Sequence, residues 1–186
     1  SSQNSNNKSD SDTNIQPILN TKYEIINDLE ELQTLETTLL KTSAFSFDTE
    51  TTSLIPTTAK LVGISITEHA GTGFYIPLGH EQGRQISMED ALPHLRNIFQ
   101  SKDVKKYAHN ANYDLTVLKN HDIEVNCFNF DTMIAAQILG YNAIGLKQLS
   151  FDLLNEPMSP INELIGSGKK QITFDQVPIE DAYQYA

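Results

Sequence analysis

Two acidic side chains stand at alternate positions at the end of a predicted strand. Asp48 and Glu50 follow the apolar residues Phe45 and Phe47, and residues two apart on a strand point to the same face of a sheet. Two carboxylates therefore converge at a strand end, which is where ligands bind in open α/β sheets. The competing interpretation is that both residues only open a polar turn.

A third carboxylate and a tyrosine come from predicted helices. Asp114 follows Asn110 by four residues, so both occupy one face of the helix that begins there. Tyr185 lies on the last predicted helix. Taken singly, Asp114 is typical of a solvated helix residue, and Tyr185 is typical of a core or boundary residue whose hydroxyl reaches water. Their chemistry depends on whether the fold brings them to Asp48.

The elements that must position these residues alternate between strand and helix. A helix is predicted over 28–41 with Asp28 as its cap, followed by strands over 44–47, 60–67 and 72–78 that suggest an antiparallel meander. The remaining predictions are a helix over 87–100 capped by Ser87 with early turns disturbed by Pro93, strands over 104–108 and 127–130, and helices over 112–120, 131–139, 146–154 and from 178 onward. This order predicts an α/β domain with one mixed sheet packed between helices.

Composition limits the function classes without deciding among them. Thirteen Lys and Arg against 24 Asp and Glu give a net charge of −11, which argues against a basic nucleic-acid grip. Divalent cations bound by the carboxylates would reverse the local sign and let an acidic cleft accept phosphate. The single cysteine, Cys127, excludes an internal disulfide and a cysteine-based zinc site. With no apolar run near the roughly 20 residues of a membrane span and no signal-peptide pattern, we expect a cytosolic protein with no membrane contact.

The chain divides into a polar tail and one domain. Residues 1–20 are mostly Ser, Asn, Asp, Gln and Thr, a composition typical of a disordered tail or an interdomain linker. The domain is expected over 21–186. A linker leading into a domain suggests a further domain upstream.

Several segments in order resemble the DEDDy exonuclease superfamily, and most closely the 3′–5′ proofreading exonuclease domain of bacterial family A DNA polymerase I. Residues 47–51 (FDTET) look like the first exonuclease motif, residues 110–114 (NANYD) look like the second, and Tyr185 takes the tyrosine position of the third. Residues 74–78, 130–133 and 171–174 also resemble segments of that domain, so the likeness runs from about Tyr23 to Ala186.

The resemblance implies an RNase H-like (DnaQ-like) fold, with a five-stranded mixed sheet flanked by helices. The third motif requires an aspartate four residues after Tyr185, and the sequence ends at Ala186. We therefore expect a domain truncated before its last catalytic carboxylate, and weak or no activity from this fragment.

The resemblance also implies hydrolysis of phosphodiester bonds by two metal ions roughly 4 Å apart. It assigns Asp48 to both ions, Glu50 to the ion carrying the attacking water, and Asp114 to the second ion. Tyr185 would orient that water. Oxygen ligands without cysteine or paired histidines favour Mg²⁺, with Mn²⁺ as a substitute.

The implied substrate is a single-stranded or frayed 3′ end of DNA, bound by stacking and backbone contacts. Thr49, Leu54 and Asn110 are the expected substrate-binding residues, with Leu54 wedged against the terminal base. An ordinary exposed loop leucine is the competing interpretation. The natural protein is expected to be a monomer in the bacterial cytosol, associated with the nucleoid, with a polymerase domain downstream for replication and repair.

Two other functions remain open at this stage. One is an RNase D-like exoribonuclease with the same chemistry. The other is a catalytically silent domain that supports a polymerase. Retention of Asp48, Glu50 and Asp114 favours an enzyme over the silent domain. A comparison of ribonucleotide and deoxyribonucleotide substrates separates the two enzymes, because only RNA carries the 2′-hydroxyl.

Overall fold

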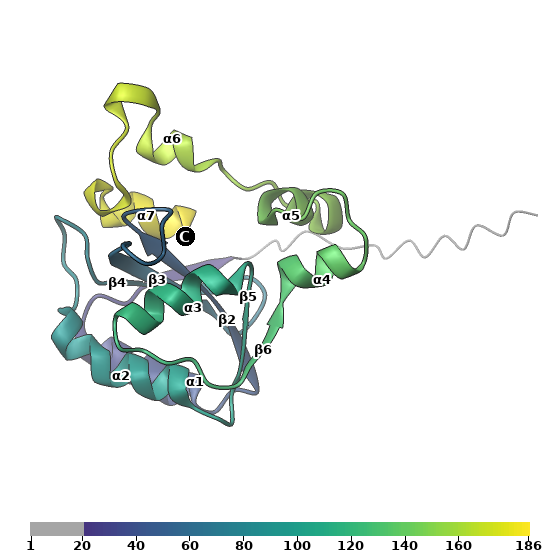
Figure 1. Ribbon diagram of the computed structural model, residues 1–186. Coiled ribbons are helices and arrows are strands. Elements are labelled where there is room, and N and C mark those ends of the chain that lie inside the picture. The colour runs from purple at the N-terminus through teal and green to yellow at the C-terminus, as the bar shows by residue number, and fades with distance from the viewer. Residues whose placement is uncertain (1–20) are drawn as a thin grey trace, which may run out of the picture.

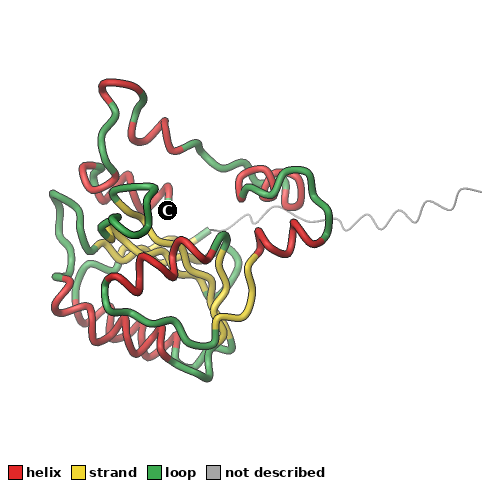
Figure 2. The backbone as a smooth tube through the Cα atoms, in the orientation of Figure 1, coloured by secondary structure: helices red, strands yellow, loops and turns green. Residues whose placement is uncertain are grey.

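A computed structural model describes residues 21–186, and the predicted tail over 1–20 lies outside them. The strands are β1 (Lys22–Ile25), β2 (Ala44–Thr51), β3 (Leu61–Thr67), β4 (Thr72–Pro77), β5 (Lys105–Ala108) and β6 (Phe128–Asp131). The α-helices are α1 (Leu29–Leu39), α2 (Met88–Gln100), α3 (Ala111–Asn120), α4 (Thr132–Ile138), α5 (Leu146–Leu154), α6 (Ile161–Ile165) and α7 (Ile179–Tyr185), and the short 3₁₀ helices are η1 (Gly168–Lys170) and η2 (Phe174–Gln176). Every predicted helix and strand is present, with ends that differ by up to four residues (Figure 2).

The six strands form one mixed sheet in the order β1-β4-β3-β2-β5-β6. The pairs β2–β3 and β3–β4 are antiparallel, which confirms the predicted meander. The pairs β1–β4, β2–β5 and β5–β6 are parallel. β2 therefore lies inside the sheet, between β3 and β5, and holds the acidic motif at a central position.

The expected count of five strands is wrong by one. β1 is the additional strand, and it pairs in parallel with β4 at the edge of the sheet. Its four residues are KYEI, and the first two are exposed. Its residues alternate polar and apolar, but over four positions only, which is too short a pattern to predict a strand, and the segment becomes one through its pairing with β4.

One face of the sheet is covered by α1, α2 and α3, which lie against the buried side chains of β2 (Figure 1). The Phe99 ring of α2 lies 5.7 Å from Phe45 and 5.1 Å from Phe47, centroid to centroid. The opposite face carries a smaller apolar cluster from η2 and α7, made of Val62, Tyr75, Phe174, Val177, Ile179 and Ala182. The odd-numbered side chains of β2 thus anchor the sheet to its helices, and the even-numbered ones face the α7 side.

The predicted helix caps are present. Asp28 accepts a hydrogen bond from the Glu31 amide at the start of α1, and Ser87 accepts one from the Asp90 amide at the start of α2. The expectation that Pro93 disturbs α2 is wrong, because the helix is continuous from Met88 to Gln100. Pro93 lies on the exposed side of the helix, where water can satisfy the carbonyl that its missing N–H leaves free.

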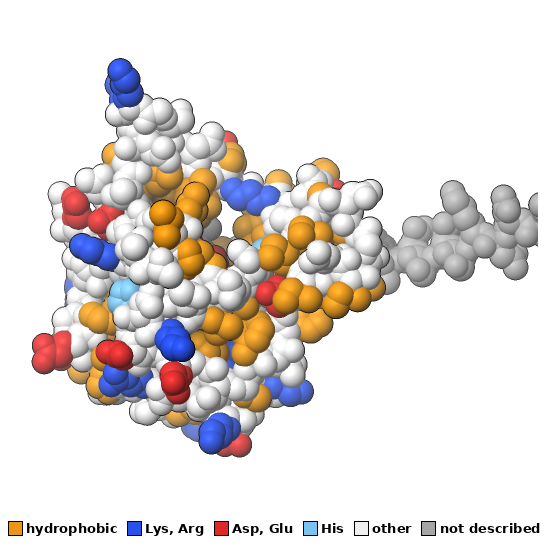
Figure 3. Space-filling view, in the orientation of Figure 1, with side chains coloured by type: hydrophobic (Ala, Val, Ile, Leu, Met, Phe, Trp, Pro, Cys, Tyr) orange, Lys and Arg blue, Asp and Glu red, His pale blue; other side chains and the backbone are white. Residues whose placement is uncertain are grey.

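Helices α4 and α5 extend away from the sheet beyond β6, and α6 lies beside α7 (Figure 1). Apolar side chains gather on the surface of this extension (Figure 3); they include Phe130, Ile134, Ile138 and Leu139. Across residues 21–186, no helix combines the length and apolar character that crossing a bilayer requires.

Candidate active site

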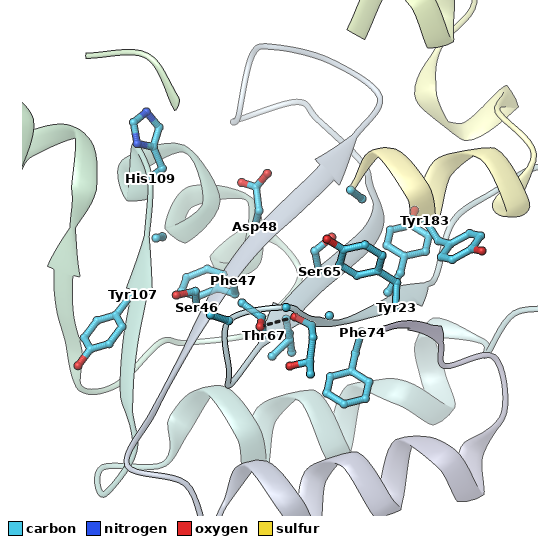
Figure 4. A pocket seen from close by; sticks show the side chains of 18 of the residues that line it. Tyr23, Ser46, Phe47, Asp48, Ser65, Thr67, Phe74, Tyr107, His109 and Tyr183 are labelled. Atoms are coloured by element: carbon cyan, nitrogen blue, oxygen red, sulfur yellow. Dashed lines mark hydrogen bonds between the residues drawn. The ribbon is translucent and has the colours of Figure 1, made fainter. Parts of the chain in front are cut away.

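β2 directs Asp48 and Glu50 to the sheet face opposite α1 and α2. Phe47 and Thr49, on either side of Asp48, are buried toward the helices, so the alternation of the strand turns both carboxylates the other way. Asp48 remains exposed to solvent, whereas Glu50 is 8% exposed. Figure 4 shows the Asp48 carboxylate projecting from β2 into the open space between His109 and α7.

Asp114 brings a third carboxylate to β2 from the first turn of α3. It is 2% exposed, and it accepts hydrogen bonds from the Thr49 amide at 3.0 Å and the Thr49 hydroxyl at 2.5 Å. Its carboxyl group is also within hydrogen-bonding reach of the Asp48 carboxyl. The fold therefore brings together the three acidic residues that the sequence singles out.

The pKa values of all three carboxylates are raised, in each case first of all by burial. Loss of water in the cleft, followed by the charge of Asp114, raises the pKa of Asp48 to about 7, although part of its side chain still reaches solvent. Burial, followed by the charges of Asp48 and Asp114, raises the pKa of Glu50 to about 8. Burial also raises the pKa of Asp114, against the hydrogen bonds from Thr49. Together they form a cluster that disfavours its own ionisation.

This cluster fits divalent cations. None of the salt bridges found within residues 21–186 involves Asp48, Glu50 or Asp114, so their charge has no basic side chain to offset it. Buried carboxylates in this situation are stabilised by bound cations, and oxygen donors are the ligands that Mg²⁺ and Mn²⁺ prefer. In the same residues, no three acidic, histidine or cysteine side chains already surround a metal position, so the carboxylates are neighbours without forming a closed set of ligands.

Tyr185 ends α7 on the same side of the sheet as the carboxylates. Its ring packs on Phe174 with centroids 6.0 Å apart, and Lys147 of α5 lies 5.5 Å above the ring. Burial, followed by the charges of Glu50 and Asp48, raises the pKa of Tyr185 to about 12. The hydroxyl therefore stays protonated at neutral pH and can donate a hydrogen bond, but it is a poor base.

The expected substrate-binding residues lie in different surroundings. Leu54 is 91% exposed on the loop after β2, with Ile55 beside it at 60%. Asn110 is exposed just before α3 in the left-handed backbone region, at φ 61°. Thr49 is buried, and its hydroxyl points to Asp114. Their contacts with substrate stay predictions.

Tyr113, which the sequence reasoning passed over, ties the Leu54 loop to α3. Its hydroxyl donates to the Ser53 carbonyl and also bonds the Thr51 hydroxyl. The Thr51 hydroxyl also lies 3.0 Å from the Ser53 carbonyl oxygen, and its one proton is donated either there or to Tyr113. The turn that carries Leu54 is thus held to the helix that carries Asp114, and only its apolar tip is free.

Asp131, also missed, organises the start of two helices. Its carboxylate accepts from the Asn110 and Ala111 amides at the start of α3, and from the Met133 and Ile134 amides at the start of α4. Burial alone would raise the pKa of Asp131, but these four donors bring it below the usual value. The available signal was an aspartate at the junction of a predicted strand and a predicted helix, a typical cap position.

A groove of about 400 Å³ runs along the sheet face next to Asp48 (Figure 4). Tyr107 and His109 of the β5 end line one side, and Tyr23 of β1 and Tyr183 of α7 line the other. Most of the groove's lining is apolar, and its two carboxylates, Asp48 and Glu24, come from β2 and β1. Its aromatic walls suit the faces of nucleic-acid bases, which stack on aromatic rings without regard to sequence.

Comparison with known proteins bears on this site. A family model described as 3′-5′ exonuclease matches residues 23–186. DNA polymerase I of Chloroflexus aurantiacus is 44% identical over 164 residues, which cover 87% of this chain and 17% of that protein. Escherichia coli RNase D, described as an exoribonuclease involved in structured RNA processing, has 18% identity and a TM-score of 0.61, over 89% of this chain and 41% of that one. Brucella melitensis NrnC with bound Mg²⁺ has 21% identity and a TM-score of 0.55, over 90% and 75%.

These matches carry different weight. At such low identity the solved structures show the fold alone, and they confirm the expected RNase H-like exonuclease fold. The chain spans less than a fifth of the length of the curated relatives it matches. The family match, in contrast, covers nearly all of the described residues, including the three carboxylates and Tyr185. This chain therefore belongs to the 3′–5′ exonuclease family, whose reaction is the hydrolysis of phosphodiester bonds.

Proposed function

We propose that this chain is the proofreading exonuclease of a DNA polymerase I, and that it removes mismatched 3′-terminal deoxynucleotides during replication and repair. The observation that carries the proposal is the meeting of Asp48, Glu50 and Asp114 without a basic partner among the described residues. The 44% identity to a DNA polymerase I supports the DNA substrate.

Two Mg²⁺ ions, replaceable by Mn²⁺, are the proposed cofactors, and Asp48, Glu50 and Asp114 are the residues that would hold them. When bound, such ions supply a deprotonated water and stabilise charge on the leaving 3′ oxygen. The structure of NrnC with bound Mg²⁺, which has the same fold, supports the choice of metal. Thr49 keeps the Asp114 carboxylate at a fixed place relative to β2 by its two hydrogen bonds.

Tyr185 is proposed to orient the attacking water. With its pKa raised to about 12, its hydroxyl keeps its proton and acts as a donor at neutral pH. Proton removal from water is therefore not its task, since a phenol with so high a pKa is almost never ionised near pH 7.

The proposed substrate is a frayed or single-stranded 3′ end. The exposed side chains of Leu54 and Ile55 form an apolar tip that would wedge against the terminal base. Asn110 is proposed to contact the substrate as well, and Thr49 to contact it through its backbone carbonyl, because its amide and its hydroxyl both donate to Asp114. A mismatched end frays more readily than a paired one, so such a site selects errors without reading sequence.

The remaining features of the natural protein are also proposals. The length of the curated relatives named DNA polymerase I supports a polymerase domain downstream of this one. We propose a monomer in the bacterial cytosol, associated with the nucleoid. An RNase D-like activity on RNA is less well supported, because RNase D resembles the chain at only 18% identity.

The test is degradation of a 5′-labelled single-stranded DNA oligonucleotide by the full-length protein that carries this chain, with Mg²⁺ or Mn²⁺. We expect stepwise shortening from the 3′ end that Asp48→Ala abolishes. Asp103→Ala is the matched control, since Asp103 is an exposed carboxylate outside the cluster. Equal shortening by wild type and Asp48→Ala would refute the catalytic role of the cluster, absence of shortening by the folded wild type would support the silent domain, and preference for the same oligonucleotide as RNA would support the exoribonuclease.

A further inference from the structure

His80 is a buried histidine outside the carboxylate cluster, and both of its ring nitrogens are engaged. It is 5% exposed, and it lies just after β4. Its Nδ1 lies 2.9 Å from the Val177 carbonyl oxygen, and its Nε2 lies 2.7 Å from the Tyr75 hydroxyl. Gln85 fixes the backbone of the same residue, accepting from its amide at 2.9 Å and donating to its carbonyl at 2.7 Å.

These partners determine the tautomer. A carbonyl oxygen only accepts, so Nδ1 must carry the proton, and in a neutral ring Nε2 must then accept from the Tyr75 hydroxyl. Burial lowers the pKa of His80 despite the Val177 carbonyl and the charges of Asp175 and Glu180. Burial, followed by the charge of Glu50, raises the pKa of Tyr75, so its hydroxyl keeps the proton that it donates.

Val177, whose carbonyl accepts from His80, lies in the segment that leads to Tyr185. Val177 is 2% exposed and joins η2 to α7. The Phe174 ring of η2 packs against both His80 and Tyr185, with ring centroids 6.1 Å and 6.0 Å apart. The Glu81 amide also donates to the Asp175 carbonyl at 2.8 Å. The loop after β4 therefore holds η2 and the start of α7 at several points.

Tyr75, the other hydrogen-bond partner of His80, lies on the sheet close to Glu50. Gly63 pairs with Glu50 across β2 and β3, and a Cβ atom at Gly63 would lie 2.2 Å from the Tyr75 hydroxyl oxygen. The Tyr75 ring thus occupies the space that a side chain at position 63 would fill. His80 therefore connects Tyr75, whose ring lies over the position paired with Glu50, to the segment that leads into the helix of Tyr185.

We propose that His80 is a positioning residue for the exonuclease reaction: by tying Tyr75 of β4 to the Val177 carbonyl, it holds α7 so that the Tyr185 hydroxyl lies near Glu50 and Asp48. This inference rests on the proposed function, since it assigns His80 an effect through Tyr185. His80 itself touches neither substrate nor metal ligand.

Three substitutions separate the two hydrogen bonds. His80→Asn places an amide nitrogen near the position of Nδ1 and keeps a donor for Val177, His80→Gln places a carbonyl oxygen near Nε2 and keeps an acceptor for Tyr75, and His80→Leu removes both. In the full-length protein with Mg²⁺, we expect His80→Leu and His80→Gln to lower kcat on single-stranded DNA on the order of 10- to 100-fold. His80→Asn loses only the bond to Tyr75 and keeps the one to Val177 from a backbone that Gln85 holds, so it should keep more of kcat than the other two variants, and KM should change little in all three.

A double substitution tests whether the effect passes through the tyrosine hydroxyl. In the Tyr185→Phe background, His80→Leu should cause no further loss of kcat, because the group that it positions is already gone. Losses that multiply in the double variant, or a His80→Leu variant with wild-type kcat, would overturn the proposal.

Amide hydrogen exchange gives a readout that does not depend on activity. Amides of 179–185 should exchange faster in His80→Leu than in wild type and His80→Asn, whereas amides of α1 should exchange alike in all of them. Equal exchange across 179–185 in His80→Leu and wild type would overturn the proposal. An active Asp48→Ala variant would instead refute the proposed function, and the exchange measurement would still decide whether His80 holds α7.

Discussion

Thr49, which separates Asp48 from Glu50 on β2, donates two hydrogen bonds to the carboxylate of Asp114 on α3. The two residues are 65 positions apart in the sequence. This contact turns two separate acidic motifs into one cluster, because the residue between two of the carboxylates holds the third.

Thr49→Val should destabilise the protein by about 1–3 kcal/mol, because it keeps the shape of the side chain and leaves a buried carboxylate short of one hydrogen bond. Thr49→Ser keeps the hydroxyl and is the matched control, with a smaller expected loss. Urea unfolding of both variants measures the difference. Equal stability of Thr49→Val and Thr49→Ser would show that the hydroxyl contributes nothing.

Asp131→Ala should cost about 2–3 kcal/mol, because four backbone amides at the starts of α3 and α4 lose their acceptor. Asp131→Asn should cost less, since three of the four amides bond Oδ1, which the amide oxygen of asparagine can replace. Thermal unfolding ranks the three proteins. An alanine variant as stable as the asparagine variant would contradict this account of the junction.

The sequence predicted those parts of the fold and site that depend on local patterns. Alternation along β2 sufficed to place Asp48 and Glu50 on one face, and helical spacing sufficed for α1 and α2 with their caps. β1 was missed because its polar and apolar residues alternate over only four positions, and the segment becomes a strand by pairing with β4.

Long-range contacts set the rest of the site and lie beyond local patterns. The Thr49–Asp114 bonds, the Tyr113 bond to Ser53 and the His80 bond to Val177 join residues at least 60 positions apart. Each contact involves a residue type that often occurs without any such contact, so the role of the residue becomes visible only when the fold brings its partner within reach. Asp131 belongs to both groups. Its capping of α4 follows from its local position between a predicted strand and a predicted helix, whereas its hydrogen bonds to the start of α3 depend on the fold.

Gly63→Ala should destabilise the protein by about 1–3 kcal/mol, because the new methyl group would lie 2.2 Å from the Tyr75 hydroxyl oxygen and 2.4 Å from the adjoining ring carbon. Combining it with Tyr75→Leu should reduce that cost, because the smaller side chain vacates the space. A double-mutant cycle by urea unfolding measures the coupling. Gly73→Ala is the control in the neighbouring strand, where the added atom would meet only the exposed ring of Tyr23. Strictly additive costs for Gly63→Ala and Tyr75→Leu would refute the steric explanation.

The metal-free protein should lose stability as the pH rises from about 5 to about 8, through the acidic cluster. Folding raises the pKa of Asp48 from its ordinary 3.8 to about 7 and that of Glu50 from its ordinary 4.5 to about 8. The folded state therefore binds protons that the unfolded state has released in this interval, so ionisation of the pair favours unfolding.

The Asp48→Asn, Glu50→Gln double variant lacks both titrating groups and is the control for histidines that change charge over the same interval. Urea unfolding in EDTA at several pH values should show that the free energy of unfolding falls more steeply with pH for wild type than for this variant. Added Mg²⁺ should restore more of that free energy at pH 8 than at pH 5.5, because protons compete with the metal for the carboxylates. Parallel pH profiles for the two proteins would mean that the folded state does not raise the pKa values of Asp48 and Glu50, and the case for a cation-binding cluster would lose its electrostatic basis.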